Sequence, residues 1–176
     1  DNTSRRGRGR SVLLGSIHSS TAWPSTTPRK WTFGILGGRT PLAHICGPLV
    51  HGVLLCRGLD SMAHPDLVKL FSNSGYAPSI PLEPLWDRMA EAARESRVHV
   101  ELSTAGLRKP CDDFYPAAGL LERFCHAGVP LTVGSDGHTP GTICYEIERA
   151  YDFARKAGYR SIDAPTADGS WRTIEL

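Results

Sequence analysis

Residues 129–141, VPLTVGSDGHTPG, decide the fold of this chain. The stretch begins with five mostly apolar residues, typical of a short buried strand, and then breaks into glycines, an aspartate and a histidine. Residues 142–157 are predicted to form a helix, because a glycine follows them as a common helix-ending signal. A strand that leads directly into a helix is typical of a parallel α/β sheet or barrel. Asp136 and His138 would then lie at the carboxyl end of the strand, where such folds carry their functional groups.

The chain repeats this alternation of strand and helix from residue 59 onward. The clearest helix is predicted over 82–96, because its apolar residues recur on one face at helical spacing. Those residues are Leu85, Met89, Ala92 and Ala93. The expected strands are 59–64, 97–102, 129–134, 159–164 and 170–176, and the expected helices are 64–71, 82–96, 115–128 and 142–157.

Residues 1–58 form a basic, poorly patterned segment. One strand is expected at 12–18, but 19–58 has neither helical nor strand periodicity and is rich in Gly, Pro, Ser and Thr. The first 59 residues carry eight Lys or Arg and a single acid, whereas the remainder carries twelve Lys or Arg and seventeen acids. This imbalance favours a frameshift in the coding DNA after the strand, with a genuine insertion as the alternative. Because the chain does not begin with methionine, we expect it to come from the interior of a longer one.

Composition limits the class of protein. The 176 residues, 40% hydrophobic and 22% charged, are ordinary for one globular domain. No run approaches the ~18 apolar residues of a membrane helix, so no membrane partner is expected. Five cysteines without paired or zinc-finger spacing predict reduced thiols and a cytoplasmic location. The basic N-terminal residues allow a nucleic-acid-binding module, but the aromatic pattern of such modules is absent, and no nucleic-acid partner is expected.

Four predicted strand ends carry side chains that can bind metals. Because the carboxyl ends of parallel strands share one rim, we expect these side chains to converge. Imidazole and carboxylate groups are natural ligands of Zn, Mn or Fe, and such metals can activate water and hold a phosphate. Each residue alone also has a plain structural explanation, such as an aspartate that caps the next helix. The residues are His18, His64, Glu101, Asp136 and His138.

Four segments taken in order resemble the histidinol-phosphatase branch of the polymerase-and-histidinol-phosphatase (PHP) superfamily. The likeness runs from Leu59 to about Gly158 and rests before that on VLLGSIH alone. It implies an α/β fold that is part of a distorted (β/α)7 TIM-like barrel with its N-terminal strands missing, 59–176 being the C-terminal part of the barrel domain. It also implies two or three divalent metal ions and hydrolysis of L-histidinol phosphate to L-histidinol and phosphate in histidine biosynthesis. The segments are GSIH (15–18), AHPDLVKLF (63–71), VELSTAGLRKP (100–110) and AGVPLTVGSDGH (127–138).

The resemblance assigns roles to individual residues. The GLRKP segment is similar to the family's substrate-facing loop. Arg108 is the first candidate for binding phosphate, because the planar guanidinium presents its N–H donors in a geometry that matches an oxyanion. Lys109 is a weaker candidate, and Glu101 would approach the substrate's amine or support the site. The substrate is expected to be a small phosphorylated metabolite. The residues matching the family's metal ligands are His18, His64, Asp136 and His138, of which the last two are expected to be catalytic.

The chain departs from the family at its start, where the His-x-His pair and other early ligands are absent. We therefore expect impaired or absent activity in this chain. The alternatives are a non-catalytic or misfolded remnant of such an enzyme, and a PHP phosphoesterase that acts on another phosphomonoester. Metal identity and number and the oligomeric state stay open.

Overall fold

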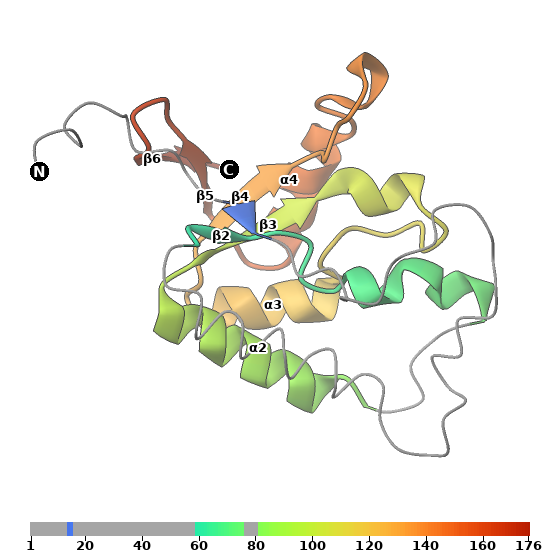
Figure 1. The fold of residues 1–176 in the computed structure, drawn as a ribbon. Helices are drawn as coiled ribbons and strands as arrows, with labels where there is room; N and C mark the ends of the chain where they lie inside the picture. The colour runs from blue at the N-terminus through green and yellow to red at the C-terminus, as the bar shows by residue number, and fades with distance from the viewer. Residues whose placement is uncertain (1–13, 16–58, 76–80) are drawn as a thin grey trace, which may run out of the picture.

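The computed structural model describes residues 14–15, 59–75 and 81–176 (Figure 1). Within them a parallel sheet has the strand order β1-β2-β3-β4, so each strand neighbours the next along the chain. The predicted α/β class with a parallel sheet is confirmed. The strands are β1 (Leu14–Gly15), β2 (Ser61–Met62), β3 (His99–Ser103) and β4 (Leu131–Gly134).

Helices follow each of the strands from β2 to β4. Three are α-helices: α2 (Glu83–Ser96), α3 (Ala118–His126) and α4 (Ile147–Lys156). Three are short 3₁₀ helices: η1 (Leu67–Ser74), η2 (Thr104–Arg108) and η3 (Pro140–Thr142). None of these helices is long and apolar enough to cross a membrane.

The predicted helix over 142–157 was wrong at its start, because α4 begins at Ile147. The residues just before α4 belong to a loop instead, which is closed by a hydrogen bond from the Cys144 N–H to Ser135 Oγ at 3.1 Å. Cys144 and Glu146 also have positive φ angles, which a helix cannot contain. The start of the helix predicted over 115–128 was likewise too early, because Tyr115 bridges to the end of β3 instead.

The core lies between the sheet and the pair α2 and α3, which run side by side along it (Figure 1). The apolar face predicted for residues 82–96 is confirmed: Met89, Ala92 and Ala93 are buried, and Leu85 packs against the core. These side chains meet a sheet in which every residue of β2 and β3 is buried. Removing this apolar surface from water is the main force that stabilises the fold.

The predicted C-terminal strands form a hairpin rather than further members of the parallel sheet. β5 (Ser161–Pro165) and β6 (Trp171–Glu175) pair antiparallel. The hairpin lies at the amino ends of β3 and β4, away from the long loop that follows β4 (Figure 1). His99 attaches it to the sheet, because its ring stacks on Trp171 at 3.7 Å and its Nε2 lies 2.9 Å from Asp163 Oδ2.

Candidate active site

The carboxyl ends of β2 and β3 bring a histidine and a glutamate together, as the sequence predicts. Nδ1 of His64, two residues beyond β2, lies 3.1 Å from Oε2 of Glu101 in β3. The backbone N–H of His64 donates to the same oxygen at 3.3 Å. Both side chains are nearly buried, with 12% and 6% of their surfaces exposed. A pair so shielded from water fixes the orientation of the imidazole ring.

Gly134, the residue that opens GSDGH, makes room for this pair. A Cβ atom at Gly134 would lie 2.3 Å from Oε1 of Glu101. The parallel pairing of β3 with β4 sets Glu101 beside this position. A glycine therefore ends β4 because the carboxylate of the neighbouring strand lies over it.

The pKa of His64 reflects its acidic surroundings. Burial lowers this pKa. The hydrogen bond and charge of Glu101, together with the charges of Asp136 and Asp66, raise it by more, so that the pKa of His64 lies above its ordinary value.

His64 and Asp136 both have positive φ angles, an unusual conformation for residues with side chains. Such backbone strain is concentrated at functional sites.

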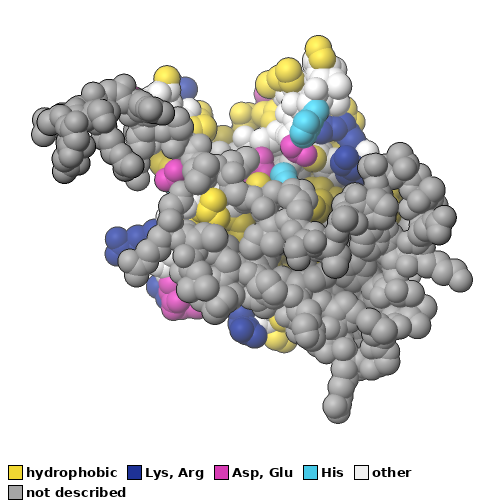
Figure 2. Space-filling view, viewed as in Figure 1, with side chains coloured by type: hydrophobic (Ala, Val, Ile, Leu, Met, Phe, Trp, Pro, Cys, Tyr) yellow, Lys and Arg dark blue, Asp and Glu magenta, His cyan; other side chains and the backbone are white. Residues whose placement is uncertain are grey.

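The structure places His138 apart from the buried pair. Its Nδ1 lies 3.0 Å from the backbone oxygen of Asp136 and 3.7 Å from Asp136 Oδ1, and 82% of its side chain is exposed. Figure 2 shows histidine, acidic and basic side chains gathered on one face where the loop between β4 and α4 projects. His138 thus joins the site through Asp136 and contacts solvent.

Arg108 ends η2 and reaches the same loop. Its Nη2 donates to the backbone oxygens of Ser135 at 2.8 Å and Asp136 at 3.2 Å, and its guanidinium carbon lies 5.1 Å from the centre of the Tyr145 ring. Its Nη1 is buried and has no hydrogen-bond partner among the residues the structure describes. Lys109, the next residue, is exposed.

The donor types suit a metal, but the described part of the chain does not complete a metal site. Imidazole and carboxylate groups are the ligands that zinc prefers. In the described ranges, however, no three His, Cys, Asp or Glu side chains are grouped so that they could hold an ion. His18 lies outside the described residues. The ligand set of His18, His64, Asp136 and His138 therefore stays a prediction.

Sequence reasoning missed a buried charge network beside His64. Asp66 is buried, and its Oδ2 accepts from the Ala117 N–H at 2.8 Å, at the start of α3. Lys69 Nζ lies 3.1 Å from Asp66 Oδ2, donates to Asp113 Oδ2 at 2.7 Å and also donates to the Phe114 backbone oxygen. The i,i+3 spacing of Asp66 and Lys69 was the available signal.

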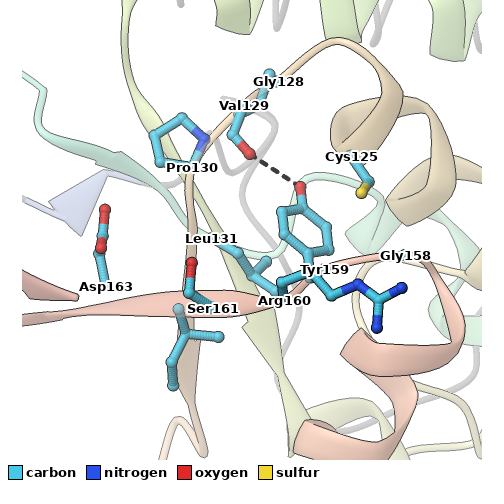
Figure 3. Close-up of a pocket in the computed structure, with 11 residues that line it drawn as sticks. Cys125, Gly128, Val129, Pro130, Leu131, Gly158, Tyr159, Arg160, Ser161 and Asp163 are labelled. Atoms are coloured by element: carbon cyan, nitrogen blue, oxygen red, sulfur yellow. Dashed lines mark hydrogen bonds between the residues drawn. The ribbon is translucent and has the colours of Figure 1, made fainter. Parts of the chain in front are cut away.

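A cavity of about 240 Å³ lies at the opposite end of the strands, near the start of β4 and β5 (Figure 3). The Tyr159 hydroxyl there donates to the Val129 backbone oxygen at 3.0 Å. The acid of the cavity, Asp163, is bonded to His99 and Thr173. Asp163 is thus engaged in holding the hairpin, and the candidate active site is the group of side chains at the carboxyl ends of the strands.

The chain is similar to known proteins in sequence and in fold. No protein-family model matches the chain. A curated relative from Deinococcus radiodurans, described as a "probable histidinol-phosphatase", is 29% identical over 153 residues, which cover 85% of this chain and 56% of the relative. The chain is therefore similar in sequence to a probable histidinol-phosphatase. The alignment is longer than the stretch from Leu59 to the end, so the likeness reaches into the first 58 residues.

The fold of the chain is also similar to a solved structure. The crystal structure of a histidinol phosphate phosphatase from Lactococcus lactis, complexed with zinc, L-histidinol and phosphate, superposes with a TM-score of 0.57 at 19% identity. The match covers 73% of this chain and 49% of that one. The chain thus spans about half the length of the relatives it matches.

Proposed function

We propose that this chain is part of a metal-dependent phosphatase that hydrolyses L-histidinol phosphate to L-histidinol and phosphate. The observation that carries the proposal is the buried Nη1 of Arg108 beside the loop of Asp136, which has no hydrogen-bond partner among the described residues. A buried charged donor without an acceptor is costly, and a phosphate oxygen would satisfy it. Similarity to a probable histidinol-phosphatase supports the choice of substrate.

The metal ligands we propose are His18, His64, Asp136 and His138. Zinc, manganese or iron bound there would supply an activated water and neutralise charge on the phosphate. Glu101 holds the Nδ1 side of His64, which is how a carboxylate orients a histidine that ligates a metal. Arg108 would bind the phosphate, and the exposed Lys109 would add positive charge near it.

We further propose that β1 to β4 belong to a distorted (β/α)7 barrel, with 59–176 as its C-terminal part. Their parallel order and the likeness to the L. lactis enzyme support this. The thiols of Cys111, Cys125 and Cys144 are free, which is consistent with a reducing compartment such as the cytoplasm.

Phosphate release from L-histidinol phosphate, measured with added zinc or manganese, tests the proposal. We expect hydrolysis that a chelator and Asp136→Asn both abolish. Arg108→Lys should lower kcat/KM about ten- to hundred-fold, because a hydrogen bond to a charged group contributes about 1.5–3 kcal/mol. The matched control is Arg155→Lys, since Arg155 pairs only with Asp152 on the exposed face of α4 among the described residues. Equal losses in the two variants would refute a phosphate-binding role.

A non-catalytic remnant is the second candidate, favoured by the absence of a three-donor metal group from the described residues. It predicts that the purified chain takes up no zinc and releases no phosphate. Hydrolysis of other phosphomonoesters but not of L-histidinol phosphate would instead identify a different phosphoesterase of the same type. Metal analysis of the purified chain, together with a panel of phosphomonoesters, separates these outcomes.

A further inference from the structure

The β4–α4 loop, residues 135–146, is attached to η2 at two places. The buried Thr104 hydroxyl donates to the Tyr145 backbone oxygen at 2.7 Å. At the other end of the loop, Arg108 Nη2 donates to the Ser135 and Asp136 backbone oxygens. The loop and η2 are therefore joined as one unit, although they follow different strands.

The β4–α4 loop is also closed on itself. The Cys144 N–H donates to Ser135 Oγ, which ties the end of the loop to its beginning. Thr139 and Thr142 form reciprocal hydrogen bonds around η3. A Cβ atom at Gly137 would meet backbone atoms of Thr142 and Ile143 at 2.7 and 2.8 Å, so the chain packs tightly there. This bracing holds Tyr145 at a defined position over η2.

The guanidinium of Arg108 is held at Nη2 and lies over an aromatic ring. Two carbonyl groups accept from Nη2, and the guanidinium carbon is 5.1 Å from the centre of the Tyr145 ring. A cation over an aromatic face is attracted by the ring, more strongly where water is partly excluded. With Nη2 occupied, the buried Nη1 is a terminal donor that no residue in the described ranges engages, so it is open to a ligand.

We propose that Tyr145 is a positioning residue that holds the Arg108 guanidinium ready to bind a phosphate monoester, a role that rests on the proposed function. The ring restricts rotation of the guanidinium before the ligand arrives, so less conformational entropy is lost on binding. The Thr104 hydrogen bond uses the backbone of residue 145, so it does not depend on the side chain there. Replacing the ring can thus change Arg108 without detaching the loop.

The test compares Tyr145→Leu with the rescuing variant Tyr145→Phe. The leucine variant should raise KM for L-histidinol phosphate, and the inhibition constant of inorganic phosphate, about two- to thirtyfold, because a cation–π contact contributes about 0.5–2 kcal/mol. Its kcat should change less than about twofold, since the ring touches no reacting group. The phenylalanine variant should restore both constants. The control is Tyr151→Leu, on α4 against the core, which should leave KM at its wild-type value.

A double-mutant cycle with Arg108→Gln shows whether the effect passes through the arginine. In that background Tyr145→Leu should cause no further rise in KM. A rise of the same size as in the wild type, or failure of Tyr145→Phe to rescue, would overturn the proposal. Should the leucine variant unfold, as judged by circular dichroism, Tyr145→Met takes its place with the same expectations.

Direct titration with inorganic phosphate separates this inference from the proposed function. If no phosphomonoester is hydrolysed but phosphate binding weakens in Tyr145→Leu and recovers in Tyr145→Phe, the function fails and the positioning role holds. If L-histidinol phosphate is hydrolysed and no constant depends on residue 145, the function holds and the positioning role fails.

Discussion

Glu101 Oε2 lies 3.1 Å from His64 Nδ1 and so joins the ends of two neighbouring strands inside a nearly buried site. The contact depends on the backbone as well as on side chains. Glu101 Oε2 also accepts a hydrogen bond from the His64 backbone N–H, and Glu101 Oε1 lies over Gly134. With two contacts to the same carboxylate, His64 is held in a defined orientation.

Gly134→Ala should disrupt this pair. The new methyl would meet Glu101 Oε1 at 2.3 Å, so the carboxylate must move and its contact with His64 is lost. We expect at least about a tenfold fall in phosphatase activity and a changed tautomer balance of the His64 ring, measured by nitrogen NMR. Gly141→Ala is the matched control, because a Cβ there meets nothing within 4 Å. Unchanged His64 signals in Gly134→Ala would contradict the structure.

Lys69→Met should destabilise the fold. The substitution leaves Asp66 buried without its cation and breaks the link from η1 to Asp113. Removing one partner of a buried pair costs about 3–5 kcal/mol, whereas loss of an exposed lysine changes stability by about 0.5 kcal/mol or less. Urea unfolding of Lys69→Met beside Lys109→Met measures the difference. Similar urea midpoints for the two variants would show that the charge network contributes little to the free energy of unfolding.

The β5–β6 turn should lose stability in acid. Hydrogen bonds from Thr166 and Ser170 lower the pKa of Asp168 to about 2 from the usual 3.8. The folded turn therefore favours the ionised form, and its contribution is complete above the usual pKa and is lost as pH falls from about 4 through 2. Carbon NMR of the Asp168 carboxyl should give a titration midpoint near pH 2. The protection of the Ser170 amide from hydrogen exchange should fall over the same pH range. A midpoint near 4 would mean that these bonds do not persist in solution.

Trp171→Ala should release the hairpin while leaving the candidate site intact. The indole stacks on His99, and an aromatic pair contributes about 0.5–1.5 kcal/mol beyond the area it buries. We expect faster hydrogen exchange across β5 and β6, with phosphate binding unchanged. Trp171→Phe keeps a stacking ring and should preserve the protection. Weakened phosphate binding in Trp171→Ala would mean that the two ends of the sheet are coupled.

Periodic features were predictable from the chain because they depend on near neighbours. The helix over 82–96 follows from apolar residues at helical spacing, and its predicted face is the buried one. The positions of His64 and Asp136 just beyond strands follow from apolar runs that end in polar residues. The parallel arrangement follows from the alternation of strand and helix.

Contacts between residues far apart in the chain required the folded structure. Lys69 meets Asp113 across 44 residues, and the hairpin pairs β5 with β6 although both were expected simply as strands. Ser135 Oγ accepts a hydrogen bond from the Cys144 N–H, and α4 begins five residues later than predicted. No local propensity encodes these pairings, because each depends on where the packed sheet brings a distant partner.

The amino-acid order alone therefore established which residue types stand at the strand ends and what chemistry they suit. The folded structure decided what these residues do. Glu101 supports His64, His138 faces solvent, and a buried donor of Arg108 has no partner in the part of the chain that the structure describes. The physical reason is that residue type and spacing act within a few turns of chain, whereas burial and charge pairing are properties of the assembled sheet.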